Sequence, residues 1–111
     1  MTPGTAPDDV VLIYTTAGTL VEAEAIGALL VEGRHAACVN ILPQMRSIYR
    51  WNGAVERSDE AVMIVKTTRA KLEPARIAFR AAHSYETPAF LVIEVPEGDA
   101  DYLAWLRGQV A

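Results

Sequence analysis

The side chains best suited to metal chemistry in this sequence are one cysteine and one histidine. Cys38 is the single cysteine, and its thiolate would suit copper or zinc. His83 could act as a metal ligand or carry a proton, because a free imidazole titrates near neutral pH. It lies close to Tyr85 and Glu86, and these three residues form the most polar group in the sequence. They are therefore the first candidates for binding a divalent cation.

Each candidate also has a purely structural interpretation. Cys38 could be a small buried side chain on a core strand, which we favour because no second Cys or His lies at ligand spacing. His83 could tie the end of a helix to the turn that follows, where an imidazolium also interacts favourably with the helix dipole. His35, beside Gly33 and Arg34, is expected on the surface. Since no catalytic triad, phosphate-binding glycine loop or carboxylate pair can be assembled, we do not expect an enzyme.

A second group of polar and aromatic residues is expected where subunits meet. Glu60 and Lys66 lie on one face of a predicted strand, in place of apolar residues. Because an unpaired charge is costly to desolvate, they indicate either a structural ion pair, which we favour, or a small polar pocket between subunits. Such a pocket would be lined by His83, Glu86, Tyr85 and a neighbour's Tyr49 or Trp51. Aromatic side chains could stack a planar ligand, but interface packing is the favoured interpretation for Tyr49, Trp51, Tyr102 and Trp105.

The elements that would position these residues begin with a buried strand and a capped helix. Residues 10–16 form an apolar, β-branched run typical of a strand buried on both faces. Thr19 and Glu22 have the spacing of a capping box, so a helix should begin after Thr19. Its apolar stripe would consist of Val21, Ala25, Ile26, Leu29 and Leu30. Gly33 is expected to end this helix in the left-handed conformation.

A long β-hairpin follows the first helix. Residues 36–42 are typical of a strand, after which Pro43 predicts a bulge or bend. Asn52 and Gly53 predict a two-residue type I′ turn, from which residues 55–67 return as the partner strand. This turn would oppose Tyr49 with Glu56, Ser47 with Ser58, and Arg46 with Asp59. The outer half of the hairpin mixes aromatic and charged side chains, so we expect it to project beyond the core and to be covered on its aromatic side.

Two more helices and a strand complete the predicted fold. Pro74 suits the first turn of a second helix that stops near His83, and residues 89–95 form a final strand. Asp99 is suited to cap a last helix. The order β-α-β-β-α-β plus a C-terminal helix predicts an α+β, ferredoxin-like fold with helices on one face of an antiparallel sheet. Since the first and third strands are apolar on both faces, the uncovered face should be buried by another subunit.

Length and composition set the class of protein. The chain has 111 residues, which suits a single domain over residues 10–111 after a polar, flexible tail over residues 1–9. The net charge of −4 gives no general attraction to nucleic acid or to an anionic membrane. No apolar stretch is long enough to span a bilayer, and the tail lacks the features of a signal peptide. A single cysteine fits a reducing compartment, so we expect the protein in the cytoplasm.

Several short motifs resemble those of the CutA divalent-cation tolerance family, in the same order. They are Ala37-Cys-Val-Asn40, Ser47-Ile-Tyr-Arg-Trp-Asn-Gly53, Glu60, Lys66-Thr67, His83-Ser-Tyr-Glu-Thr-Pro88 and Tyr102-Leu-Ala-Trp105. The resemblance covers residues from about 10 to 106 and implies a homotrimer of ferredoxin-like subunits whose long hairpin wraps a neighbour. One departure is Ser84, because the family usually has proline directly after this histidine. The turn after the second helix is therefore expected to be less rigid.

The resemblance implies a cytoplasmic homotrimer with a part in tolerance of divalent cations such as Cu²⁺, with weak metal binding and no obligatory cofactor. The ligands would be drawn from Cys38, His83, Glu86 and Glu60. The cleft between subunits would contain Tyr49, Trp51, Lys66 and Tyr85, while Tyr102 and Trp105 would pack the trimer. The alternative is a trimeric signalling or scaffold protein that binds a small metabolite or a protein at this cleft. In that case Lys66, Arg46 and Arg50 would matter more than Cys38.

Overall fold

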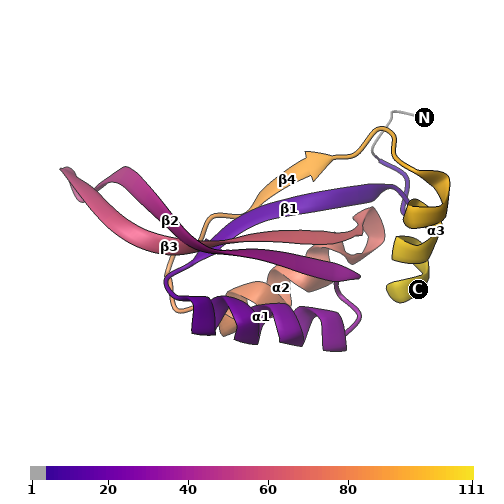
Figure 1. Cartoon of the computed structure of the whole chain (residues 1–111), viewed down its shortest axis with the longest axis horizontal. Coiled ribbons are helices and arrows are strands. Elements are labelled where there is room, and N and C mark those ends of the chain that lie inside the picture. Colours follow the sequence, from indigo (N-terminus) through magenta and orange to yellow (C-terminus); the bar gives the residue numbers. More distant parts are fainter. Residues whose placement is uncertain (1–4) are drawn as a thin grey trace.

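The chain forms one antiparallel sheet with two helices on one face and a third helix at one end (Figure 1). The computed structural model describes residues 5–111. Its elements are β1 (Val10–Ala17), α1 (Leu20–Glu32), β2 (Cys38–Trp51), β3 (Ala54–Thr68), the short 3-10 helix η1 (Arg69–Lys71), α2 (Leu72–Ala82), β4 (Leu91–Glu94) and α3 (Ala100–Gln109). The predicted α+β, ferredoxin-like order is confirmed.

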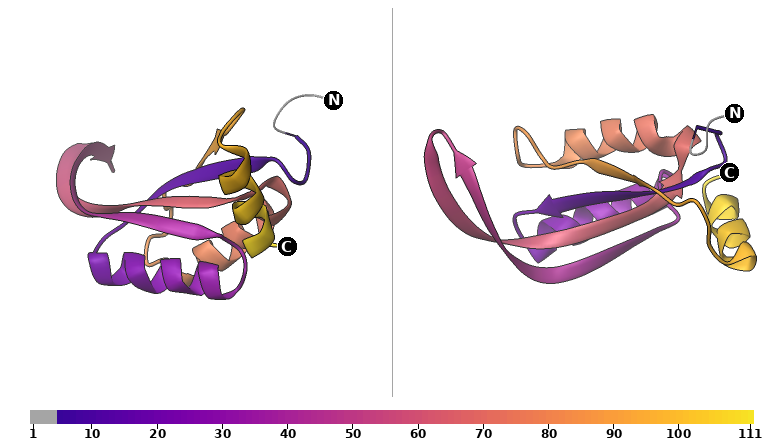
Figure 2. Two further views of the ribbon diagram at one scale, coloured as in Figure 1. Left: turned by 45° about the vertical axis from the view of Figure 1, so that its right-hand side comes forward. Right: turned by 90° about the horizontal axis from the view of Figure 1, so that it is seen from above.

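The sheet has the strand order β2-β3-β1-β4, and its two middle strands are β3 and β1. The β2–β3 hairpin extends well beyond the helices, and Figure 2 shows its outer half curling out of the plane of the sheet. Asn52 (φ 49°) and Gly53 (φ 81°) both have positive φ, as the predicted type I′ turn requires. All three predicted pairs are present, namely Tyr49 with Glu56, Ser47 with Ser58, and Arg46 with Asp59.

A shift of register in β2 divides the hairpin into an inner and an outer half. Leu42 lies opposite Val62, but Met45 lies opposite Glu60, so β2 holds one extra residue in this interval. Pro43 lies within it and has no N–H to give to the ladder. The bulge predicted at Pro43 is therefore confirmed.

The first turn of α1 is capped as predicted, with one difference. The N–H of Glu22 donates to Thr19 Oγ1 at 3.1 Å. The Glu22 carboxylate does not return to Thr19 but accepts the N–H of Gly18 at 3.2 Å. The second oxygen of this carboxylate remains available for a partner elsewhere in the chain.

The end of α1 differs from the prediction. Gly33 has a φ of −80°, and Arg34 is the residue that adopts a positive φ, of 59°. Glycine is present at this position because a larger residue would be crowded. A Cβ on Gly33 would lie 2.8 Å from Cδ2 of His35 and 3.2 Å from the carbonyl oxygen of Leu29. The close approach of the chain after the helix, and not a left-handed conformation, requires glycine here.

The buried face of α1 also differs from the predicted stripe. The buried residues are Ala23, Ile26, Gly27 and Leu30, whereas the exposed residues include Val21, Ala25 and Leu29. Small residues let the helix lie close to the sheet, since a Cβ on Gly27 would be 3.4 Å from Cγ1 of Val39. Because α1 is apolar on most of its surface, residue spacing alone did not distinguish its two faces.

The core lies between the two helices and one face of the sheet. Its largest buried side chains are Phe79, Ile13, Ile26, Leu30 and Met63. A second, smaller cluster fixes α3 against the end of the sheet and contains Val10, Ala37, Leu106 and Val110.

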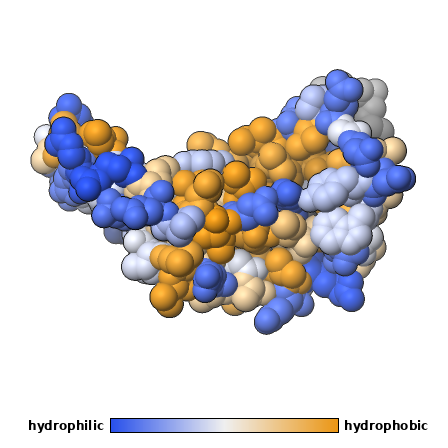
Figure 3. All heavy atoms as spheres, in the orientation of Figure 1, coloured by the Kyte–Doolittle hydropathy of each residue, from blue (hydrophilic) through white to orange (hydrophobic). Residues whose placement is uncertain are grey.

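The other face of the sheet is called the open face below. Within residues 5–111 no helix covers its middle, and α3 reaches it only at one end, where Tyr102 contacts Lys66. The strand register places on the open face Leu12, Tyr14, Thr16, Cys38, Asn40, Leu42, Glu60, Val62, Ile64, Lys66, Leu91 and Ile93. Leu42, Leu91 and Ile93 are exposed, and Figure 3 shows apolar surface gathered over the strands. Burial of this face by another subunit stays a prediction.

The final strand is shorter than predicted, because β4 covers Leu91–Glu94 and not residues 89–95. The hydroxyl of Thr15 donates to the carbonyl oxygen of Ala89 at 2.6 Å. A side chain of β1 thus takes the acceptor that a backbone N–H would use if the ladder continued. The segment before β4 is therefore bound to β1 without being a strand.

Residues 5–9 form a turn that is bonded to the rest of the chain. The N–H of Ala70 donates to the carbonyl oxygen of Pro7 at 3.0 Å, and Nε of Arg107 donates to the carbonyl oxygen of Asp8 at 2.8 Å. This part of the predicted tail is thus attached to η1 and α3. Residues 1–4 lie outside the described residues.

Candidate functional site

A polar cluster forms where β1 ends, at the base of the hairpin. The hydroxyl of Thr16 and the phenol of Tyr85 both donate to Oε2 of Glu60, at 3.1 and 3.0 Å. Thr16 comes from β1, Glu60 from β3 and Tyr85 from the turn after α2. Two segments far from β3 in the sequence therefore donate hydrogen bonds to one carboxylate on the open face.

His83 connects this cluster to the core. Its side chain is buried, with Nε2 2.7 Å from the carbonyl oxygen of Thr16, and Nδ1 accepts the N–H of Tyr85 at 2.9 Å. Because Nδ1 accepts, the proton of the neutral ring must be on Nε2, which donates to Thr16. The ring also packs against Phe79 and Tyr85, with centroid distances of 5.0 and 4.7 Å. His83 therefore ties the end of α2 to β1, as its structural interpretation predicts.

Glu22 is a member of the cluster that sequence reasoning did not assign to the site. Its Oε2 accepts the N–H of Ser84 at 2.9 Å, while Oε1 accepts the N–H of Gly18. Partial burial alone would raise the pKa of the Glu22 carboxyl, but hydrogen bonds from Ser84 and Gly18 outweigh it and lower that pKa. The sequence signal was the capping spacing, which explained Glu22 without reference to Ser84.

Tyr85 serves as a hydrogen-bond donor at any physiological pH. Burial, followed by the hydrogen bond to Glu60 and the charge of that carboxylate, raises the pKa of Tyr85 to about 12. Tyr49 contributes to the same rise in pKa and accepts a hydrogen bond from Ser58 at 3.3 Å. Tyr49 of the same chain therefore lies near the cluster, while a contribution from a neighbour's Tyr49 or Trp51 stays a prediction.

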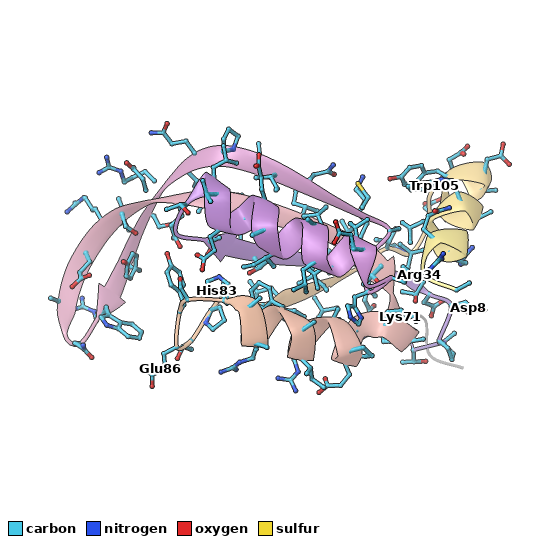
Figure 4. All side chains as sticks on the ribbon, turned by 90° about the horizontal axis from the view of Figure 1, so that it is seen from below. Asp8, Arg34, Lys71, His83, Glu86 and Trp105 are labelled. Carbon is cyan, nitrogen blue, oxygen red and sulfur yellow. The ribbon has the colours of Figure 1, made fainter. Side chains whose placement is uncertain are left out.

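The structure does not bring Cys38 or Glu86 to this cluster. Cys38 lies opposite Lys66, whereas the cluster residue Glu60 comes six residues before Lys66 in β3, a separation of about 20 Å. Glu86 is exposed, its carbonyl oxygen accepts a hydrogen bond from Arg80, and Figure 4 shows its side chain on the outside of the loop. Among residues 5–111, no group of three or more His, Cys, Asp or Glu side chains is placed to hold a metal ion.

Lys66 forms a separate arrangement at the other end of the open face. Its ammonium nitrogen donates to the hydroxyl of Tyr102 at 3.0 Å and lies 5.3 Å from the centre of that ring. The hydrogen bond to Tyr102 raises the pKa of Lys66 despite partial burial. Tyr102 packs in turn on Trp105, with a centroid distance of 5.7 Å. Within one chain, the expected ion pair is not formed, because Glu60 and Lys66 each bond a neutral hydroxyl.

The chain matches one protein family over nearly its whole length. The family is described as "CutA1 divalent ion tolerance protein", and the match covers residues 11–109. A relative from Thermus thermophilus, named "Divalent-cation tolerance protein CutA", is 41% identical over 100 residues, which are 90% of this chain and 95% of the relative. A relative of the same name from Archaeoglobus fulgidus is 43% identical over 94 residues, covering 85% of this chain and 91% of the relative.

Solved structures show the same fold. The crystal structure of CutA from Xylella fastidiosa superposes with a TM-score of 0.91 at 36% identity, covering 93% of this chain and 99% of that one. The relatives' names refer to tolerance of divalent cations and to no reaction.

Two relatives have names that include a compartment. The solved Archaeoglobus protein is called periplasmic, and a relative from Arabidopsis thaliana is called chloroplastic. Within residues 5–111, no helix combines the length and the apolar character needed to cross a membrane. The cytoplasmic location of this chain stays a prediction.

The family match, the identities and the superposition agree with one another over nearly the whole chain. This chain therefore belongs to the CutA1 divalent ion tolerance protein family.

Proposed function

We propose that the protein acts in the cytoplasm as a homotrimer that takes part in divalent-cation tolerance by binding a cation such as Cu²⁺ weakly. The observation that carries this proposal is the convergence of Glu60 and His83 on the end of β1. A carboxylate and an imidazole are ligands that Cu²⁺ accepts, and both lie within one hydrogen-bonded cluster. The family to which the chain belongs supports the divalent cation as the ligand class.

Weak binding follows from the small number of ligands within one chain. Tight protein sites for such metals use three or four side chains, and no such group is assembled within residues 5–111. Of the four predicted ligands, Glu60 and His83 lie in the cluster. Cys38, which lies far along the sheet, and Glu86, whose exposed side chain lies on the outside of the loop, would be supplied by a neighbouring subunit. A site completed in this way responds to the cation only in the assembled protein.

The open face supports the trimer. Leu42, Leu91 and Ile93 are exposed on it, and such apolar surface on a small protein usually marks an interface. Its flanking residues Tyr102 and Trp105 are the aromatic types that interfaces favour. Sedimentation at micromolar concentration should give three times the mass of one chain, and a monomer would contradict the proposal.

The metal site is tested by titrating Cu²⁺ into the protein and following the heat of binding. Glu60→Gln and His83→Ala should each weaken Cu²⁺ binding at least about tenfold, because loss of even a supporting group near a metal commonly has that effect. Glu56→Gln is the matched control, since it removes an exposed carboxylate from the same strand outside the cluster. Binding that is unchanged in Glu60→Gln and His83→Ala would exclude this cluster as the site.

A further variant tests whether the site spans two subunits. Cys38→Ala should weaken Cu²⁺ binding only if a neighbour's thiolate reaches the cluster. Glu86→Gln tests the other distant ligand in the same way. Full affinity in both variants would confine the site to Glu60 and His83.

The alternative, a trimeric signalling or scaffold protein, is favoured by one observation. Lys66 carries a positive charge on an apolar face, and its hydrogen bond to Tyr102 goes to a neutral phenol. An anionic group of a metabolite or of a protein could therefore pair with the ammonium group of Lys66. Tyr49 and Trp51 of the hairpin would line the same cleft, and Arg46 and Arg50 would offer further positive charges from the other face of the ribbon. A thermal-shift screen separates the two functions, because stabilisation by an anionic metabolite that is lost in Lys66→Gln would favour the alternative.

A further inference from the structure

We infer that a divalent cation can bind His83 only when the turn of residues 83–86 opens, so that cation binding and closure of this turn compete. This inference rests on the proposed function and concerns how the same site is regulated. It follows from how the two nitrogens of His83 are used.

Neither ring nitrogen has a lone pair to offer in the closed state. Nδ1 uses its lone pair to accept the N–H of Tyr85, and Nε2 carries the proton that is donated to Thr16. A metal ion needs a nitrogen lone pair, so binding must break one of these two bonds. Coordination through Nδ1 releases the N–H of Tyr85. Coordination through Nε2 requires the ring proton to move to Nδ1, so it ends the hydrogen bonds to both Thr16 and Tyr85.

The turn is held closed by the other members of the cluster. Ser84 donates its N–H to Oε2 of Glu22, and Tyr85 donates its hydroxyl to Oε2 of Glu60. The acceptor carboxylates belong to α1 and β3, so the turn is fixed to two elements as well as to its own histidine. The contact from Ser84 exists because this residue has a backbone N–H, which a proline in its place would lack.

Glu60 links the two states directly. The Glu60 carboxylate accepts the hydroxyl of Tyr85 and is also a proposed ligand. A cation bound to this carboxylate reduces its negative charge and so weakens the hydrogen bond that holds the turn closed. The apparent affinity for the cation is then the intrinsic affinity multiplied by the fraction of molecules in which the turn is open. By thermodynamic linkage, the factor by which closing the turn weakens cation binding equals the factor by which the bound cation shifts the turn toward its open state.

The first test loosens the turn without removing either ligand. Tyr85→Phe removes the hydroxyl that bonds Glu60, so it should tighten Cu²⁺ binding roughly threefold to tenfold in a calorimetric titration. Tyr102→Phe is the matched control, because it removes a phenol of similar exposure that contacts Lys66 at the other end of the open face. Weaker binding in Tyr85→Phe would overturn the inference, since it would make the hydroxyl part of the cation site.

The second test observes the turn itself by hydrogen exchange with mass spectrometry. Saturating Cu²⁺ should speed exchange of the amides of Ser84 and Tyr85 in the unaltered protein, while residues 11–14 of β1 keep their rate. Tyr85→Phe should speed the same two amides without any cation. Slower exchange, or no change, when Cu²⁺ is bound would overturn the inference.

The two proposals fail in different ways. If Cu²⁺ binds and Glu60→Gln weakens it, but neither exchange nor the Tyr85→Phe affinity changes, the competition is wrong and the proposed function stands. If neither the unaltered protein nor Tyr85→Phe binds Cu²⁺, the proposed function is wrong and the inference falls with it.

Discussion

The two ends of the open face satisfy opposite charges with the same kind of partner. At one end Glu60 accepts a hydrogen bond from the phenol of Tyr85, and at the other Lys66 donates to the phenol of Tyr102. The partners differ in how they are held, because Tyr85 comes from a turn fixed by hydrogen bonds, whereas Tyr102 comes from a helix whose Leu106 is buried in the second, smaller apolar cluster. The Glu60 end can therefore rearrange at the expense of a few polar contacts, while the Lys66 end cannot move without disturbing a packed helix.

The largest expected effect is from removing the histidine that supports the Glu60 end. His83→Ala should lower the free energy of unfolding by about 3 kcal/mol, because it leaves the carbonyl of Thr16 without its partner and opens space beside Phe79. Urea unfolding at fixed protein concentration measures this. His35→Ala, which alters a partly exposed histidine, should change the free energy far less; equal losses would mean that His83 has no special supporting role.

The comparison between the two phenols can be tested directly. Tyr85→Phe should lower the free energy of unfolding by about 1 kcal/mol, because the charge of Glu60 loses a donor. Tyr102→Phe should lower it by less than about 0.5 kcal/mol, since the ammonium group of Lys66 keeps access to water and to the aromatic ring. A larger loss for Tyr102→Phe would reverse our view of which end depends more on its phenol.

Acid should weaken the Glu22 contacts in a defined pH range. The pKa of the Glu22 carboxyl is lowered in the folded protein, so its contribution to stability is present above the ordinary value of 4.5 and is lost as the pH falls through the folded pKa. Unfolding curves of the unaltered protein and of Glu22→Gln should therefore converge below pH 4.5 and separate above it. A difference that stays constant over this range would show that ionisation of Glu22 contributes nothing.

The smallest effect is expected in the outer hairpin. Arg46 and Asp59 form an ion pair with Nε 2.9 Å from Oδ1, but both side chains are well exposed. Asp59→Asn should change the free energy of unfolding by less than about 0.5 kcal/mol, and high salt should abolish the difference. A salt-independent loss above 1 kcal/mol would indicate that this part of the hairpin is buried by a neighbour.

Local patterns predicted the hairpin in detail. The register of the outer half followed from Asn52 and Gly53, because a two-residue turn fixes the pairs as far as the bulge, and Pro43 marked the bulge because it lacks an N–H. Thr19 likewise marked the start of α1. These features depend on residues close together in the sequence, where geometry leaves few choices.

The candidate site was only partly predictable. Glu60, His83 and Tyr85 were identified as polar residues in unusual places, but the contact between Glu22 and Ser84 joins residues that are 62 positions apart. No local pattern encodes such a contact. The set of four metal ligands was inferred from residue type, and strand register then placed Cys38 far from the cluster. The predicted buried face of α1 is wrong for a related reason, since a helix with apolar residues on most of its surface does not reveal which side packs on the sheet.

The bulge beside Pro43 bends β2 where the outer half of the hairpin leaves the sheet. Between Leu42 and Met45 the chain of β2 advances three residues while β3 advances two, so odd-numbered residues of the outer half share a face with even-numbered residues of the inner half. Deleting Gln44 would place Pro43 opposite Ala61 and keep every pair on both sides of the bulge, with Tyr49 still opposite Glu56. The deletion would instead remove the local bend and the extra twist that a bulge gives its strand. One residue of length thus sets the direction in which the outer hairpin leaves the sheet, and not the face that its side chains offer.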